Sequence, residues 1–232
     1  MGLRTPLLAL VALRRVRNLA LVLLPYGAGL MVLPILGPSL SEPDRAGLTA
    51  VAIAPALVSA PALAGAIGGR MDRAGALLLG SIGVWLALAL SRGPAAAAAA
   101  QGAILPFVVG AGITSAVPML PDIVRTAVRR VGDAAFVVLA AVAVSGAGGL
   151  DAPIGLAALA LFVATIGTAA IVARIGGVDL ASAIAGAGSR DPAVATALTL
   201  ALGGVTTIPL CSGILLLALS AVLALRNRRK AR

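Results

Sequence analysis

The sequence lacks histidine altogether and contains one cysteine, Cys211, among its 232 residues. The absence of histidine removes the commonest general base and metal ligand. A single cysteine excludes an internal disulfide and any cysteine-rich metal site. The chain also has no serine-nucleophile motif. We therefore expect no enzymatic activity, no catalytic residue, no metal site and no resident cofactor.

Charged and aromatic residues are also scarce, at 11% and 2% of the chain, whereas globular proteins carry roughly 25% charged residues. Apolar residues make up 60% of the sequence, and its mean hydropathy is +1.10. Because a soluble chain of this length cannot bury so much apolar surface, the composition predicts an integral membrane protein with the lipid bilayer as its partner. The net charge of +10 does not indicate nucleic-acid binding, because one Trp and one Tyr offer few surfaces for base stacking.

Eight segments reach the roughly 20 apolar residues that span a bilayer. Breakers such as Gly37-Pro38 and Gly203-Gly204 mark the junctions between them. The expected fold class is therefore an all-α integral membrane protein with about eight transmembrane helices. Their predicted bounds are 18–37, 46–68, 74–91, 98–119, 133–149, 153–173, 180–202 and 205–225.

The loops between these segments show a strong charge asymmetry. With the N-terminus placed inside, the outside loops contain only Arg45 and Arg92, and Arg190 falls within a span. Because cytoplasmic loops are rich in Lys and Arg, we expect a multi-pass protein of the inner or plasma membrane with both termini cytoplasmic. The inside loops then hold 15 of the 18 basic residues: Arg4, Arg14, Arg15, Arg17, Arg70, Arg73, Arg125, Arg129, Arg130, Arg174, Arg226, Arg228, Arg229, Lys230 and Arg232.

The seventh span contains two charged residues, Arg190 and Asp191. A charge at bilayer depth costs roughly 3 kcal/mol or more, so such residues face a cavity or a partner. Pro192 disfavours helical geometry in the residue before it, and Gly186 and Gly188 loosen the preceding turn. We expect a half-helix, an unwound stretch and a second half-helix that begins at Pro192 with Asp191 as its N-cap. The alternative is a short loop or an interfacial Arg-Asp pair.

A second interrupted span is expected at 46–68, which contains Pro55 and Pro61. The predicted topology gives the span triplets 18–91 and 153–225 opposite orientations, and each triplet has its broken helix in the middle. Transporters built from inverted repeats place such discontinuous helices around their substrate and ion sites. The pattern therefore predicts an inverted repeat of three-helix units with two crossing helices.

Five short motifs follow one another along most of the chain: Arg14-Arg15-Val16-Arg17, Ala54-Pro55 through Asp72, Leu105-Pro106 with Gly110, Gly188-Ser189-Arg190-Asp191, and the step at Gly203-Gly204 into 205–225. In this order they resemble parts of the third, fourth, sixth, ninth and tenth helices of the bile acid:sodium symporter family. The fourth motif occupies the place of a Gly-x-Gln-Asn or Gly-x-Arg-Asn element in the ninth helix.

The resemblance implies a core domain and a panel domain. In that family helices three to five and eight to ten form the core, so this chain would keep the core and half of the panel while lacking the first two helices. A homodimer or a second subunit would complete the panel. The expected units are a cytoplasmic interfacial segment at 1–17, a first core repeat at 18–91, a partial panel domain at 92–150, a second core repeat at 151–225 and a basic cytoplasmic tail at 226–232.

The resemblance also bears on the coupling ion. In that family a glutamate before the Gly-x-Gln-Asn element and Ser or Asn side chains at the fourth-helix crossing bind sodium. Here Gly186 takes the glutamate position and no Asn occurs from Ser59 to Leu63, so the ligands that sodium coupling would need are missing. The guanidinium of Arg190 would take the electrostatic role of the cation. Asp191 would then be its counter-ion or a proton carrier.

Three functions remain open from the sequence. The first is secondary active transport of a small organic anion by alternating access, with a carboxylate or sulfonate drawn to Arg190 and to the half-helix that begins at Pro192. The second is proton-coupled antiport or export, with Asp191 as the titrating group. The third is a non-transporting membrane subunit. The predicted binding residues are Gly188, Ser189, Arg190, Asp191, Pro192, Ser59, Pro61, Thr206 and Thr207.

Overall fold

The structure is a computed structural model that describes residues 16–57, 59–94, 98, 141 and 143–230. Within these residues every regular element is a helix, which confirms the all-α class for this part of the chain. The predicted spans 98–119 and 133–149, the segment 1–17 and the partial panel domain lie wholly or mostly outside the described residues.

Four described helices are long and apolar enough to cross a membrane. They agree within a few residues with four of the predicted spans. The four helices are α2 (Val16–Leu36), α5 (Met71–Leu90), α8 (Ala152–Ile175) and α11 (Thr207–Lys230). Helix α8 begins after the N-cap residue Asp151, whose side chain accepts a hydrogen bond from Ile154 N at 3.0 Å.

The two segments that the prolines interrupt are discontinuous, as predicted. The first divides into α3 (Glu42–Ile53) and α4 (Ala60–Ala66). The second divides into α9 (Leu180–Ala183), the π-helix η2 (Ile184–Gly188) and α10 (Pro192–Ala201). Neither division leaves a piece long enough to span a bilayer alone, because each residue adds only about 1.5 Å of helix.

Proline accounts for both breaks. Ala54 precedes Pro55 and adopts extended backbone angles, φ −57° and ψ 147°. Asp191 precedes Pro192 and is likewise extended, with φ −76° and ψ 111°. The ring of a proline disfavours helical geometry in the residue before it. Helix α3 ends immediately before that residue, whereas η2 ends earlier, at Gly188, where Ser189 is already extended. A proline in the first turn of the next half-helix costs nothing, because that turn has no partner for its N–H groups.

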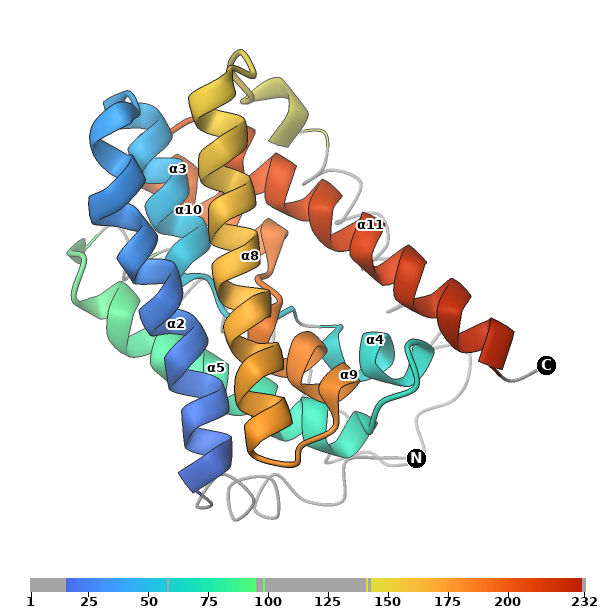
Figure 1. Ribbon diagram of the computed structural model, residues 1–232. Coiled ribbons are helices and arrows are strands. Elements are labelled where there is room, and N and C mark those ends of the chain that lie inside the picture. Colours follow the sequence, from blue (N-terminus) through green and yellow to red (C-terminus); the bar gives the residue numbers. More distant parts are fainter. Residues whose placement is uncertain (1–15, 58, 95–97, 99–140, 142, 231–232) are drawn as a thin grey trace, which may run out of the picture.

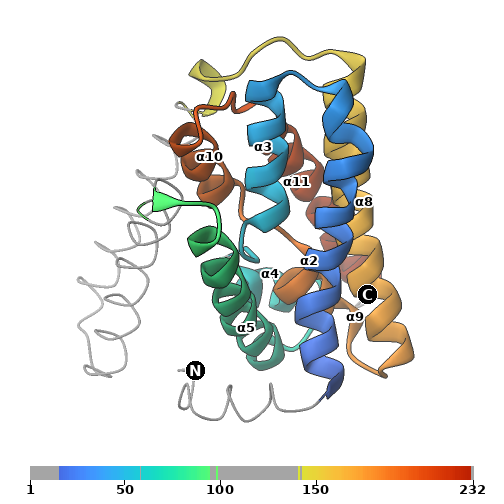
Figure 2. The same ribbon diagram turned by 90° about the vertical axis from the view of Figure 1, so that its left-hand side faces the viewer.

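The two broken helices run in opposite directions through the bundle. The helices α2 and α8 lie side by side and antiparallel, while α5 and α11 run along opposite sides (Figure 1). Half-helices α3 and α10 pack together toward one end, and α4, α9 and η2 pack together toward the other (Figure 2). The breaks therefore meet near the middle of the bundle, about halfway along the long helices.

The two ends of the bundle differ in charge. One end, which we call the basic end, contains the start of α2, the α4–α5 loop and the end of α8, with Arg17, Arg70, Arg73 and Arg174. Asn227 near the end of α11 also reaches this end, where its Nδ2 donates to Ala66 O at 3.4 Å. The opposite end contains Glu42, Asp44, Arg45 and Asp151 at the starts of α3 and α8. This arrangement matches the charge asymmetry of the sequence.

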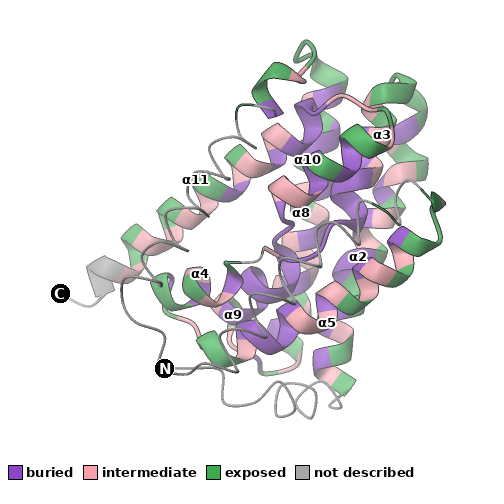
Figure 3. Ribbon diagram, turned by 180° about the vertical axis from the view of Figure 1, so that it is seen from behind, coloured by how far each residue is buried: buried purple, intermediate pink, exposed green. Residues whose placement is uncertain are grey.

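Small residues let the half-helices approach closely. A side-chain Cβ at Gly186 would lie 2.7 Å from Ala74 O, and one at Gly204 would lie 2.7 Å from Pro43 O. Residues of η2 and the 189–191 break are buried, whereas α11 shows mostly exposed and intermediate residues (Figure 3). Large apolar side chains such as Met31, Ile171 and Leu217 are exposed on the long helices. Close backbone packing inside and apolar side chains outside are typical of helices surrounded by lipid.

Candidate functional site

The two helix breaks contact each other directly. Asp191 N donates a hydrogen bond to Pro55 O at 2.9 Å, and Leu57 N donates to Ser189 Oγ at 3.4 Å. The Ser189 hydroxyl in turn donates to Ala185 O at 2.5 Å. Each break leaves backbone groups without a helical partner, and burial of such groups is costly unless they are bonded elsewhere. The contacts between the two breaks satisfy part of this requirement, and they confirm that the breaks meet inside the protein.

Side chains from α2 and α5 hold the first break in place. Ala56 N donates to Ser81 Oγ at 2.7 Å. The hydroxyl of Tyr26 donates to Ser81 O at 2.9 Å and lies 2.9 Å from Ser81 Oγ. Tyr26 and Ser81 are both buried. The sequence reasoning did not select either residue, although Tyr26 is the only tyrosine of the chain.

Arg190 lies in the second break and is 7% exposed. Its guanidinium stacks on the ring of Tyr26, with Cζ 3.9 Å from the ring centroid. All three guanidinium nitrogens are buried without a hydrogen-bond partner among the described residues. A guanidinium carries five N–H donors and stays charged in proteins. The cation–π contact supplies about 2 kcal/mol or more when desolvated, but the donors remain available to a ligand.

Asp191 caps α10, as predicted. Its Oδ1 accepts hydrogen bonds from Ala193 N at 2.9 Å and Val194 N at 3.1 Å. Within the described residues no ion pair joins Arg190 to Asp191, and the role of Asp191 as counter-ion or proton carrier stays a prediction. The backbone at Ser189 and Asp191 is extended. Consecutive side chains point to opposite sides of an extended chain, which separates the two charges.

A cavity of about 10 Å³ lies next to this site. Its walls come from α3, α8, α11 and the second break. Two of its lining residues are Arg190 and Ser212, and none of the described residues that line it is a carboxylate. The Ser212 hydroxyl is buried without a hydrogen-bond partner in the described part of the chain. The availability of this hydroxyl is a finding of the structure.

The structure brings only some of the predicted binding residues together. Gly188, Ser189, Arg190 and Asp191 are buried where the breaks meet, and Pro192 follows them, half-buried. Ser59 is exposed, and Pro61 lies half-buried in the first turn of α4. These two residues remain predictions, because nothing in the described contacts joins them to Arg190.

Thr206 and Thr207 lie away from the meeting point of the breaks. They precede or begin α11 and are separated from the break by the length of α10, about 15 Å for ten residues. Thr206 N donates to Gly146 O at 3.1 Å, and its hydroxyl donates to Ala143 O. Thr207 Oγ1 accepts from Gly148 N at 2.8 Å. Their hydrogen bonds hold the 143–148 segment against α11.

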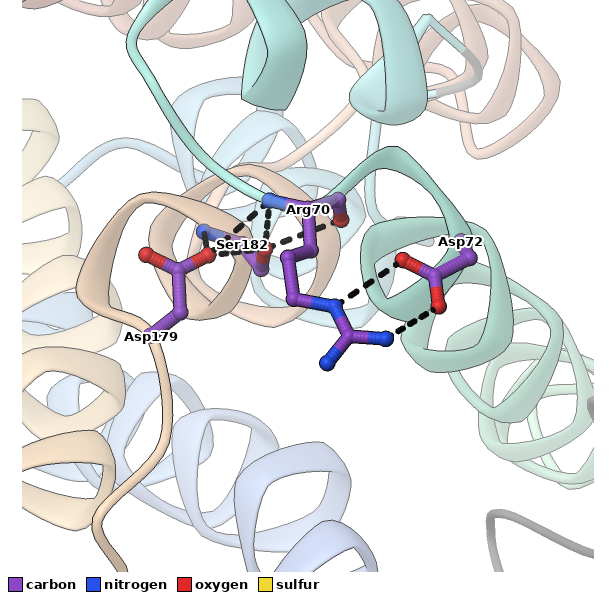
Figure 4. Close-up of polar contacts among 4 residues, drawn as sticks. All are labelled: Arg70, Asp72, Asp179 and Ser182. Atoms are coloured by element: carbon purple, nitrogen blue, oxygen red, sulfur yellow. Dashed lines mark hydrogen bonds and ion pairs between the residues drawn. The ribbon is translucent and has the colours of Figure 1, made fainter.

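A separate polar cluster joins the two broken helices at the basic end (Figure 4). Arg70 N donates to Asp179 Oδ2 at 3.1 Å and to Ser182 Oγ at 2.7 Å. Ser182 also bonds to Arg70 O and to Asp179, which caps α9. Burial raises the pKa of Asp179, but the hydrogen bonds from Ser182 and from the backbone lower this pKa by more than burial raises it, so the net shift is downward. The side chain of Arg70 pairs with Asp72 at 2.7 Å.

The described residues contain no group of three or more Cys, Asp or Glu side chains that could hold a metal ion. Comparisons with family models, with curated proteins and with solved structures found no match to this chain. The resemblance to the bile acid:sodium symporter family therefore stays a prediction.

Proposed function

We propose that this protein is a secondary active transporter of a small organic anion, which binds where the two broken helices meet. The observation that carries the proposal is the buried guanidinium of Arg190, whose nitrogens have no hydrogen-bond partner among the described residues. An isolated buried charge is strongly unfavourable unless something pairs with it. An anionic ligand would supply both the missing charge and the missing acceptors.

The arrangement of the helices supports this proposal. Unwound backbone at membrane depth is tolerated only where it is buried in protein or lines a cavity, and transporters use such breaks to bind substrates. Here the breaks after Ile53 and after Gly188 contact each other through Pro55 and Asp191. Two interrupted helices that run in opposite directions are what an inverted repeat would produce. Alternating access would then move this core against the partial panel within 92–150, completed by a second copy or another subunit.

The charge distribution supports an orientation for the proposed transporter. The basic end would face the cytoplasm, because positively charged loops are retained there. Both termini would lie on that side of the inner or plasma membrane. The fixed charge of Arg190 would replace sodium as the positive partner of the substrate, since Gly186 stands where a sodium-binding glutamate is expected from the resemblance.

Uptake into proteoliposomes tests the proposal. The full chain is reconstituted and screened with radiolabelled small carboxylates and sulfonates, while sodium and pH gradients are varied separately. We expect saturable uptake that Arg190→Ala abolishes. Arg45→Ala is the matched control, because Arg45 is the basic residue at the start of α3, away from the breaks. Equal uptake by wild type and Arg190→Ala would refute the binding role.

The same vesicles address the two remaining functions. Proton-coupled antiport predicts a dependence on the pH gradient that disappears in Asp191→Asn. The structure offers little specific support for it, because Asp191 already serves as the cap of α10. A non-transporting subunit predicts no uptake by the chain alone and co-purification with an obligate partner.

A further inference from the structure

Ser212 differs from several hydroxyls of the described helices that bond to their own backbone. Thr165, Thr196, Thr199 and Ser220 each donate to the carbonyl four residues earlier, at 3.0, 2.8, 2.7 and 2.6 Å. This back-bonding is the usual way in which Ser and Thr satisfy themselves within an apolar helix. Ser212 is 9% exposed, and its Oγ has no partner among the described residues. A buried hydroxyl without a partner carries a desolvation cost, so a ligand that accepts a hydrogen bond from it would be stabilised there.

Ser212 and Arg190 line the same cavity, although they come from different elements. The volume of about 10 Å³ is close to the room that one water molecule requires. The remaining walls include the apolar side chains of Leu161, Phe162 and Leu216. A cavity with a fixed positive charge, a free hydroxyl donor and no acidic lining residue favours an acceptor with negative charge. It disfavours a cation, which would meet the guanidinium without a compensating carboxylate.

Among the described residues that line the cavity, Arg190 carries the only charge, which favours an anion with one negative charge. A single guanidinium neutralises a monovalent anion, whereas a divalent anion would leave an unpaired negative charge in a site of low polarity. The small volume limits the part of the ligand that enters the cavity to a compact group. We infer that the site takes a compact monovalent anion, held by the guanidinium of Arg190 and by a hydrogen bond from the Ser212 hydroxyl. This inference rests on the proposed function, because it assigns the substrate class of the same site.

Binding to the full chain in detergent tests the inference without any transport step. Trp85 is the only tryptophan of the chain, and it packs in one cluster with Tyr26, on which Arg190 stacks. Its fluorescence therefore reports ligands that move the guanidinium, and titration calorimetry provides a second readout. The probes are acetate and chloride as monovalent anions, and succinate and sulfate as divalent ones. The acetate and chloride arms separate an organic substrate from a halide.

We expect acetate or chloride to bind saturably, and succinate and sulfate to bind at least about tenfold more weakly. Ser212→Ala should raise the Kd of the monovalent probe about tenfold, the effect of one hydrogen bond to a charged group. Ser212→Thr, which restores a hydroxyl, should recover most of the affinity. Ser220→Ala is the matched control on the same helix, because its hydroxyl is bonded to Leu216 O, and its Kd should equal that of the wild type.

Three outcomes would overturn the inference: no saturable binding of either monovalent probe by folded protein, equal Kd values for wild type and Ser212→Ala, or divalent probes that bind as tightly as monovalent ones. Anion binding without transport would refute the transport proposal but not the anion site. If acetate or chloride binds with the expected dependence on Ser212 but no substrate accumulates in proteoliposomes, the anion site stands and the transport function falls.

Discussion

Two Arg–Asp pairs in this protein occupy opposite environments. Arg70 and Asp72 lie at the basic end with side chains 63% and 68% exposed, and they form an ion pair at 2.7 Å. Arg190 and Asp191 are adjacent in sequence and buried, yet the aspartate caps a helix and the arginine stacks on Tyr26. An exposed pair can satisfy itself because water and side-chain rotation allow it. The buried side chains of Arg190 and Asp191 form no such ion pair, and the N–H donors of the Arg190 guanidinium become available for function.

The sharpest way to break this comparison is to replace each arginine with leucine. We expect Arg190→Leu to abolish uptake and to stabilise the folded protein by about 1 kcal/mol or more, because a buried charge without a hydrogen-bond partner is removed. Arg70→Leu should keep uptake and change stability by no more than about 1 kcal/mol. Proteoliposome uptake and thermal unfolding in detergent measure both effects. A loss of stability in Arg190→Leu would mean that the contacts of the guanidinium in the folded protein, including the stacking on Tyr26, outweigh the cost of burying its charge.

The role of Tyr26 can be divided into its ring and its hydroxyl. Tyr26→Phe keeps the ring under Arg190 but loses the hydrogen bond to Ser81, at a cost of about 1 kcal/mol. Tyr26→Leu also loses the cation–π contact, which should cost a further 0.5 to 2 kcal/mol, roughly. Thermal unfolding in detergent measures the two steps. If Phe and Leu variants are equally stable, the stacking of Arg190 on the ring contributes nothing.

The capping role of Asp191 sharpens the comparison further. Asp191→Ala removes the acceptor of Ala193 N and Val194 N and should destabilise the protein by about 1 kcal/mol. Asp191→Asn keeps an accepting oxygen and should lose less than half of that. The unfolding midpoints of the two variants decide this. An equal loss in the Asn and Ala variants would indicate that the negative charge of Asp191, rather than its cap, is what the fold needs.

The smallest expected effect is the pH dependence at the basic end. The pKa of Asp179 is lowered in the folded protein relative to its ordinary value of 3.8, because hydrogen bonds outweigh its burial. Its contribution to stability is therefore present above about pH 3.8 and is lost as the pH falls through the lower folded-state pKa. Unfolding midpoints measured across this acidic range should fall more steeply for wild type than for Asp179→Asn. Parallel curves would show that Asp179 is not protonated on unfolding.

Local sequence features predicted the elements of the fold well. Apolar runs located α2, α5, α8 and α11, because length and hydropathy alone decide whether a segment can cross a bilayer. Proline was the sequence signal at both breaks, because its ring disfavours helical geometry in the residue before it, although α2 runs through Pro25 and Pro34 without a break. The start of α3 at Glu42 precedes the predicted bound of 46–68, since Ser41 caps a charged first turn that hydropathy cannot detect.

The candidate site was only partly predictable. Burial of Arg190 and the capping role of Asp191 followed from their place beside Pro192, but Tyr26, Ser81 and Ser212 did not. Ser212 carries no local signal, because its neighbours in sequence resemble those of the self-satisfied hydroxyls. Tyr26 carries a weak local signal in the sequence, because it is a polar aromatic residue within an apolar span. The predicted role of Ser59 stays a prediction, whereas the structure separates Thr206 and Thr207 from the breaks by the length of α10.

The sequence by itself determined that this chain belongs in a membrane, where its long helices lie and where two of its segments must unwind. Those properties depend on apolar length and on proline geometry, both of which act along the chain. Only the tertiary structure decided that Arg190 meets an aromatic ring instead of its neighbouring carboxylate, and that Ser212 shares a cavity with it. Which side chains face each other depends on how helices distant in sequence pack, and no local pattern records that.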